Sequence, residues 1–174
     1  ALGVLLSVPA FITLLIVLFF VIAYSVKGLR FKEIPVLDSI TSSLHFVGPL
    51  VVAMALFHFP PQVIPYVVAF FLWGMASHMF GAVQDIIPDR KGGLQSIATV
   101  FGARGTTIVS FVLYASASII VCLQGGLSIV VGVAGLAYVV NVAPYLRVTD
   151  KASTVTNKGW KRFLWINYAV GAVL

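Results

Sequence analysis

The residues with the clearest chemical potential lie in one polar stretch, His78–Gly93, between two apolar runs. Asp85 and Asp89 are four residues apart, a spacing that puts two carboxylates on one face of a helix. Proteins usually bind Mg²⁺ through one or two carboxylates together with substrate phosphates. Arg90 and Lys91 follow directly and add charge-assisted donors for phosphate oxygens. The stretch therefore predicts a site for Mg²⁺ and a phosphate group, with Asp85 and Asp89 as the catalytic metal ligands.

A plainer interpretation of the same stretch stays open, namely a solvated loop that marks the end of a membrane helix. Pro88 biases Ile87 away from helical geometry, so we expect the two aspartates to straddle a helix end rather than share a regular turn. The D-x-x-x-D spacing by itself does not decide between these two interpretations.

A second polar segment carries three cations in six residues directly after an apolar run: Lys27, Arg30 and Lys32, with Tyr24 just before them. One interpretation is a basic anchor on anionic lipid, where each such charge contributes about 1 kcal/mol. The other is a clamp for a diphosphate, in which Arg30 and Lys32 are catalytic and Tyr24 and Lys27 bind the substrate. The acidic partners in the other loop favour the clamp.

Helical spacing adds three further candidates for substrate binding. Asp38 and His45 fall on one stripe of the second apolar run, and His78 and Asp85 fall on a matching stripe of the third. Polar groups in a membrane helix face a partner or a cavity, so the two stripes are expected to face each other or a shared pocket. A histidine at such a place is more often a hydrogen-bonding residue between helices than a catalyst.

The composition identifies the elements that must position these residues. The chain has 174 residues, of which 60% are hydrophobic and only 9% charged, whereas an ordinary soluble domain is about 45–50% apolar and about 25% charged. Its net charge of +6 comes from residues too few and too segregated to form a nucleic-acid face. The single Cys122 permits no internal disulfide. The chain is therefore expected to be an integral membrane protein.

A helix that crosses the bilayer core needs about 20 apolar residues. Runs of that kind predict an all-α, polytopic transmembrane bundle in a single domain, 1–174. The expected spans are Leu2–Tyr24, Leu37–Phe57, Val63–Gln84, Thr106–Leu123 and Leu127–Leu146, with a sixth that begins near Phe163 and is cut off at Leu174.

The basic residues predict the orientation of the bundle. All eleven Lys and Arg residues fall in the first, third and fifth connections between the runs, and none falls in the second or fourth. The positive-inside rule places those alternate loops in the cytoplasm and residue 1 outside, in the cell membrane. Because the sequence begins and ends inside apolar runs, we expect it to be part of a longer chain.

At its two polar loops the sequence resembles the UbiA superfamily of intramembrane prenyltransferases. The match lies in the Tyr-Ser…Lys/Arg loop at Tyr24 and in a second aspartate motif at Asp85 and Asp89. Further stretches resemble most closely the lycopene elongase branch, which builds long-chain carotenoids. They are Leu37–Ser39, His45–Pro49, Gly74–Asp85, Ser96–Arg104 and Phe163–Asn167.

The resemblance implies about six spans of a nine-span fold, without the part that carries the family's first aspartate motif. It also implies Mg²⁺-dependent transfer of a prenyl group from an allylic diphosphate, dimethylallyl diphosphate, to a lipophilic acceptor, lycopene. An aromatic, quinone or tetrapyrrole acceptor is the alternative within the family. A non-enzymatic membrane bundle or a transporter fragment is the alternative outside it. The oligomeric state is left open.

Overall fold

The computed structural model describes residues 6–57 and 59–172, and in this part of the chain the secondary structure is helical, without strands. The all-α prediction is confirmed. The α-helices are α2 (Val8–Ser25), α3 (Leu37–Phe57), α4 (Ile64–Val83), α5 (Ile86–Lys91), α6 (Ile97–Cys122), α7 (Ser128–Val142) and α8 (Asn157–Gly171).

Five helical segments among the described residues are long and apolar enough to cross a membrane. They are Val8–Ser25, Leu37–Phe57, Pro61–Val83, Ile97–Cys122 and Ser128–Tyr145. Each of these segments overlaps one of the first five predicted spans, although the first begins at Val8 and the fourth at Ile97. Residues 2–5 of the first predicted span lie outside the described residues.

The predicted sixth span differs from the structure. Helix α8 begins at Asn157 rather than near Phe163, has 15 residues, and is not one of the five candidate spans. Its first turns carry Lys158, Lys161 and Arg162, which lower its apolar character. Residues 173–174 of the predicted span lie outside the described part of the chain.

The predicted start of the fourth span at Thr106 is also too late, because α6 begins at Ile97. Ser96 and Thr99 form a capping box: the Thr99 backbone N–H donates to Ser96 Oγ, and the Ser96 backbone N–H donates to Thr99 Oγ1 at 2.8 Å. Gly102 then interrupts the regular helix with φ 72°. Gly102 and Arg104 interrupt the apolar run, so the part of it that predicted the span begins only after the first turns of α6.

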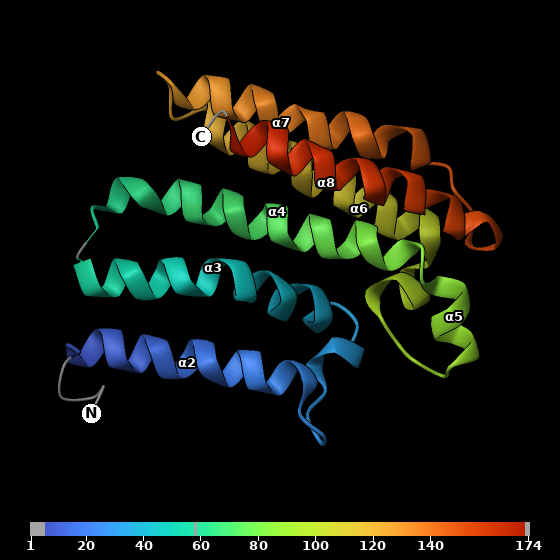
Figure 1. Cartoon of the computed structure of the whole chain (residues 1–174), viewed down its shortest axis with the longest axis horizontal. Helices are drawn as coiled ribbons and strands as arrows, with labels where there is room; N and C mark the ends of the chain where they lie inside the picture. The colour runs from blue at the N-terminus through green and yellow to red at the C-terminus, as the bar shows by residue number, and fades with distance from the viewer. Residues whose placement is uncertain (1–5, 58, 173–174) are drawn as a thin grey trace.

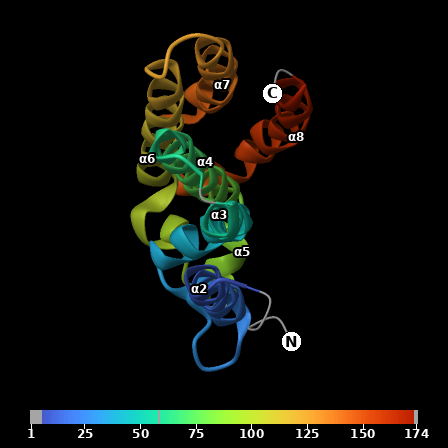
Figure 2. The same cartoon turned by 90° about the vertical axis from the view of Figure 1, so that its left-hand side faces the viewer.

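The helices that follow one another in sequence pack side by side, so the bundle forms a curved row (Figures 1 and 2). Helices α2, α3 and α4 lie next to one another, and the most extensive packing is between α4 and α6. Helix α7 packs on α6, and α8 contacts both α7 and α4. Helix α4 is therefore the central element, with α3, α6 and α8 around it.

Small residues and short hydroxyl side chains hold α4 against its neighbours. Gly74 faces Ser43 of α3, whose hydroxyl donates to the Phe71 carbonyl at 2.6 Å. On the other side, the Ser110 hydroxyl of α6 donates to the Ala76 carbonyl at 2.8 Å. Small residues let helix backbones approach closely, and such bonds join helices where no water competes. Helices α3, α4 and α6 are therefore closely packed against one another.

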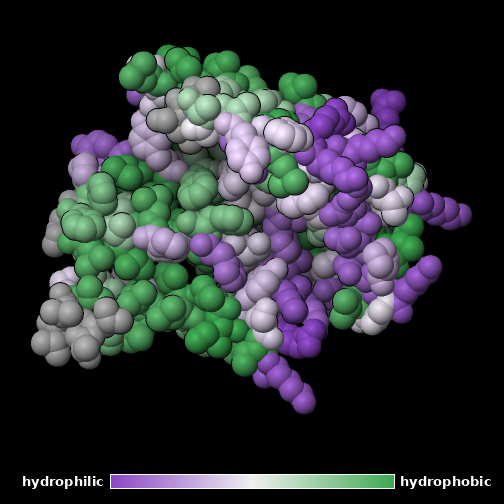
Figure 3. Space-filling view, viewed as in Figure 1, coloured by the Kyte–Doolittle hydropathy of each residue, from purple (hydrophilic) through white to green (hydrophobic). Residues whose placement is uncertain are grey.

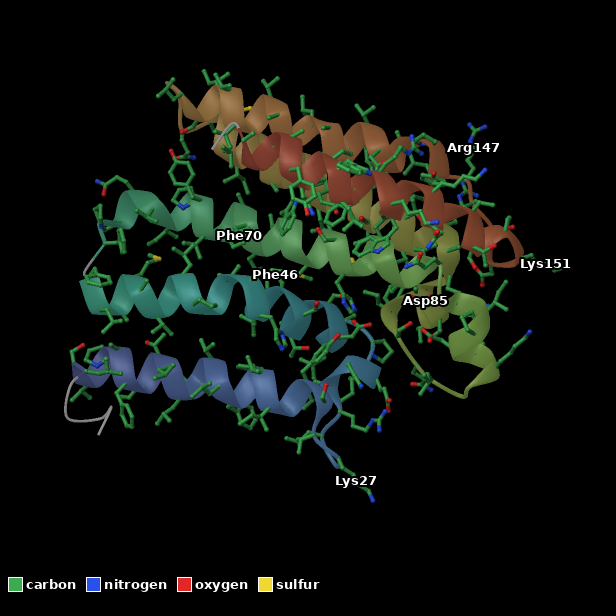
Figure 4. The ribbon with its side chains drawn as sticks, in the orientation of Figure 1. Lys27, Phe46, Phe70, Asp85, Arg147 and Lys151 are labelled. Atoms are coloured by element: carbon green, nitrogen blue, oxygen red, sulfur yellow. The ribbon has the colours of Figure 1, made fainter. Side chains whose placement is uncertain are left out.

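The hydrophilic side chains gather at one end of the bundle (Figure 3). Lys27, Asp85, Arg147 and Lys151, from three different connections, all lie at that end (Figure 4). The three basic loops therefore share one end of the molecule, as the alternation of charged and uncharged loops predicts.

Candidate active site

A cavity of about 600 Å³ lies at this polar end, between the α2–α3 loop, the α4–α6 connection and α8. Six of the predicted site residues line it: Tyr24, Arg30, Lys32, His78, Asp85 and Asp89. The basic segment and the acidic stretch, far apart in sequence, thus share one hollow. Lys27, Asp38, His45, Arg90 and Lys91 are not among the residues that line it.

The acidic pair is held by a short helix rather than by a continuation of the span. Asp85 is the N-cap residue of α5, with φ −96° and ψ 1°, and Asp89 lies in its first turn. The Asp89 backbone N–H donates to the Asp85 carbonyl at 2.9 Å, which closes that turn. Pro88 lies in the same first turn, where a missing N–H is tolerated. Both aspartates therefore lie beyond the end of α4, at the start of α5. The prediction that Pro88 keeps Ile87 out of a helix and the pair off a regular turn is wrong, because both residues are helical and the aspartates are one helical turn apart.

Both carboxyls titrate above the ordinary value. Burial raises the pKa of Asp85, and the neighbouring charge of Asp89 raises it further. Burial also raises the pKa of Asp89, an effect that a hydrogen bond from Ser96 partly offsets. The ionised forms of these two carboxyls are destabilised by burial and by their mutual repulsion. A bound cation would offset both effects and so stabilise the charged pair.

The donor set fits a magnesium ion that is bound together with a substrate. Among the described residues, no group of three or more His, Cys, Asp or Glu side chains is placed to hold a metal ion. A pair of hard carboxylate oxygens suits Mg²⁺, which keeps several ligand positions for water or phosphate. Asp85 and Asp89 are therefore suited to hold Mg²⁺ jointly with phosphate oxygens, and are too few to make a closed structural metal site.

The basic side of the cavity comes from the turn between α2 and α3. Arg30 adopts a left-handed backbone conformation, with φ 43°, and introduces a 3₁₀ turn over Phe31–Glu33. Its guanidinium forms an ion pair with Glu33, and Lys32 lines the same wall. Lys27 lies at the exposed tip of the loop and points away from the bundle (Figure 4). Arg30 and Lys32 thus supply the positive charge beside the cavity.

Asp38 lies outside the cavity, fully buried within the protein. One of its carboxylate oxygens accepts the Ile97 backbone N–H at 2.7 Å, and the other accepts the Ser39 backbone N–H at 2.6 Å. His78 Nε2 lies 3.6 Å from the first of these oxygens. Asp38 therefore ties α3 to the start of α6 and borders the imidazole that lines the cavity, which is a positioning role.

The imidazole of His45 likewise interacts with neighbouring protein groups rather than with the cavity. Its Nδ1 lies 2.7 Å from the Thr41 carbonyl of the same helix, and its ring packs edge-on against Tyr24 at 5.0 Å between centroids. The two predicted stripes therefore do not both face the cavity. His78 and Asp85 line the shared pocket, whereas Asp38 and His45 support the residues around it.

Arg90 is engaged in a link that the sequence did not reveal. Its guanidinium lies 2.7 Å from the Asp150 carboxylate and also donates to the Thr99 carbonyl at 2.7 Å. Asp150 in turn accepts the Ala103 backbone N–H at 2.7 Å. The Ala103 N–H and the Arg90 charge hold the pKa of Asp150 below its ordinary value. Arg90 therefore fixes α5 against α6, while Lys91 is exposed.

The deep wall of the cavity is aromatic, and the sequence did not identify its members. Phe46, Trp73, Trp160 and Phe163 line it from α3, α4 and α8. Trp73 and Trp160 each stack on Phe163, with centroid distances of 5.9 and 4.8 Å. The one available signal was the abundance of Phe and Trp in the third span, which does not show which rings face inward. The cavity is therefore charged at its mouth and apolar at depth.

Comparison with known proteins gives a consistent family assignment. The lycopene elongase/hydratase of Corynebacterium glutamicum is 46% identical over 156 residues, covering 88% of this chain and 54% of that protein. The C(50) beta-cyclic carotenoids biosynthesis protein LbtBC of a Dietzia species is 46% identical over 157 residues, covering 88% of this chain and 36% of its own length. The lycopene elongase/hydratase of Haloarcula japonica is 40% identical over 85 residues, covering 49% of this chain and 29% of that protein.

This chain spans about half the length of the first of these relatives. No solved structure matches it. The model of the UbiA prenyltransferase family matches residues 1–169, nearly the whole sequence. The chain belongs to the UbiA prenyltransferase family.

Proposed function

We propose that the protein transfers a prenyl group from an allylic diphosphate, dimethylallyl diphosphate, to lycopene, in the synthesis of long-chain carotenoids. The observation that carries the proposal is the cavity whose mouth brings Arg30 and Lys32 opposite Asp85 and Asp89, above an aromatic and apolar interior. The relatives named as lycopene elongases support the choice of acceptor. The integral membrane setting suits an acceptor that dissolves in lipid.

In the proposed reaction the diphosphate lies at the mouth and the prenyl group points inward. The carbon–oxygen bond of the allylic diphosphate breaks, and both electrons stay with the diphosphate oxygen. Arg30 and Lys32 neutralise the charge that develops there, which is the kind of electrostatic stabilisation that usually contributes most. When bound by Asp85 and Asp89, Mg²⁺ would supply Lewis-acid neutralisation of the same phosphate oxygens.

The interior then protects the allylic cation. A terminal double bond of the acceptor attacks it to form a new carbon–carbon bond, and a proton is lost from the adjacent carbon to water at the mouth. Trp73 and Phe163 are among the aromatic residues that line this region, and an aromatic ring attracts a cation. Their rings also exclude the water that would quench the cation.

The remaining basic residues are proposed to act from outside the cavity. Lys27 and Lys91 are exposed at the polar end and would attract the anionic donor over a distance. By the positive-inside rule that end faces the cytoplasm of the cell membrane, where the water-soluble donor is available.

The test is prenyl transfer by the natural full-length protein in lipid vesicles, with radiolabelled dimethylallyl diphosphate, lycopene and added Mg²⁺. Asp85→Ala and Asp89→Ala should each lower turnover by a factor of 100 or more, on the scale of about 10² to 10³ for loss of one stabilising group. Wild-type turnover in both variants would remove the acidic pair from the reaction. Transfer to an aromatic or quinone acceptor, and none to lycopene, would replace the acceptor in the proposal.

A further inference from the structure

A second cavity of about 600 Å³ lies within the membrane-spanning part, between α4, α6, α7 and α8. Its walls combine aromatic and aliphatic side chains with five small residues on three of these helices, which leave room between the larger ones. The small residues are Ala69, Ala117, Ser118, Gly132 and Gly135. Gly135 is so close to α6 that a Cβ atom there would lie 2.7 Å from the Ser118 hydroxyl. Helices α6 and α7 are therefore tightly packed at their contact, and the room lies beside it.

The chemistry of this second cavity suits a hydrocarbon. None of the residues that line it is Asp, Glu, Lys or Arg. Two of its tyrosine hydroxyls are already paired within the protein: Tyr114 with Ser77 at 2.9 Å, and Tyr138 with Asn167 at 2.8 Å. A charged ligand would lose its hydration there without compensation. The diphosphate is thereby restricted to the first cavity.

The two cavities share a wall. Trp73 and Asn167 line both of them. The Trp73 ring stacks on Phe163 of the first cavity at 5.9 Å and on Phe70 of the second at 5.5 Å. A long molecule in the second cavity would therefore lie next to the first cavity, with Trp73 at the boundary.

We propose that the second cavity binds the hydrocarbon chain of the lipophilic acceptor, with the reactive double bond directed toward Trp73. This inference rests on the proposed function. The short prenyl group of the donor needs no second chamber, so the long substrate is the one that does. An acyl chain of a membrane lipid has the same chemistry, and the experiment separates these two occupants.

The first arm uses the wild-type natural full-length protein in nanodiscs, photolabelled with a long-chain alkyl diazirine. Val121 and Val131 line the cavity, whereas Ile119 and Val133, on the same two helices, are 55% and 54% exposed on the outer surface. Excess lycopene should suppress labelling of the first two by at least fivefold and leave the second two unchanged. Equal suppression at all four positions, or suppression by added phospholipid as strong as that by lycopene, would overturn the proposal.

The second arm fills the cavity with one side chain. Ala117→Phe should raise the KM for lycopene at least tenfold and leave the KM for dimethylallyl diphosphate unchanged. Ala115→Phe is the matched control, because Ala115 is on the same helix but does not line the cavity. An unchanged KM for lycopene in folded Ala117→Phe would overturn the proposal.

The two arms also separate this inference from the proposed function. A wild-type protein that shows lycopene-protected labelling at Val121 and Val131 but transfers no prenyl group would contradict the proposed function and support the placement of the hydrocarbon. A protein that transfers normally but shows no protection would do the reverse. The labelling arm needs no variant, so misfolding of Ala117→Phe does not remove the test.

Discussion

Replacement of Asp38 by alanine should destabilise the bundle. The Asp38 carboxylate is fully buried and accepts two backbone N–H groups, those of Ile97 and Ser39, at 2.7 and 2.6 Å. A hydrogen bond to a charged group contributes about 1.5–3 kcal/mol, and a buried donor left without a partner costs about 1–3 kcal/mol. The Ile97 N–H is at the start of α6, where a helix offers it no backbone acceptor. We therefore expect Asp38→Ala to lower the free energy of unfolding by about 3 kcal/mol.

The assay is reversible unfolding of the natural full-length protein in mixed detergent micelles, followed by circular dichroism. Asp38→Asn should lose about half as much, on the order of 1.5 kcal/mol, since one amide oxygen can still accept one of the two N–H groups. Asp85→Ala is the control: Asp85 lines the cavity and forms no side-chain cap to its own helix. That variant should leave the unfolding free energy unchanged or slightly higher, because it relieves repulsion with a neighbouring carboxylate.

The contrast between Asp38 and Asp85 tests whether Asp38 positions the helices or binds the substrate. Asp38→Ala should lower stability and, in the folded fraction, leave the affinity for inorganic diphosphate within about a factor of 3. An Asp38→Ala variant of wild-type stability that had lost diphosphate binding would refute the assignment of Asp38 as a positioning residue and restore it to the substrate site.

Three further predictions concern the same end of the bundle and its packing. Arg30→Ala should raise the KM for the donor and lower kcat about 100-fold. Lys27→Ala at physiological salt should change kcat/KM by less than about threefold, because an exposed charge is screened. Steady-state kinetics of the two variants would measure this difference. Asp150 has a lowered pKa, so its contribution to stability is present above the ordinary Asp pKa and is lost as the pH falls through the lowered value; in Asp150→Asn, acid titration of the unfolding midpoint should lack this loss. A Cβ atom at Gly74 would lie 3.2 Å from a Cα atom of α3, so Gly74→Ala should lower the free energy of unfolding by about 1–3 kcal/mol. Gly105→Ala, with only an ordinary contact at 3.6 Å, should be neutral or stabilising. Equal unfolding free energies for both variants would contradict the close α3–α4 packing.

The sequence determined where the membrane helices lie and which loops share one end. Apolar length is a local property, so five spans could be located from it, and the charge of each loop is local as well. The spacing of Asp85 and Asp89 also depended only on neighbouring residues, whereas the break expected from Pro88 does not occur because Pro88 lies in the first turn of α5, where a proline is tolerated. The start of α6 escaped prediction because Gly102 and Arg104 interrupt the apolar run that follows its polar capping box.

Only the tertiary structure decided which polar residues face the cavity. Helical periodicity puts Asp38 and His45 on one stripe, but it does not fix how that stripe is rotated toward the neighbouring helices, and Asp38 turns to Ile97. The partner of Arg90 is Asp150, 60 positions later in the chain, and no local pattern encodes such a pair. The position of Trp73 in the walls of both cavities also depends on tertiary structure. Its neighbours come from helices distant in sequence, and side-chain packing among those helices sets the direction in which each ring points.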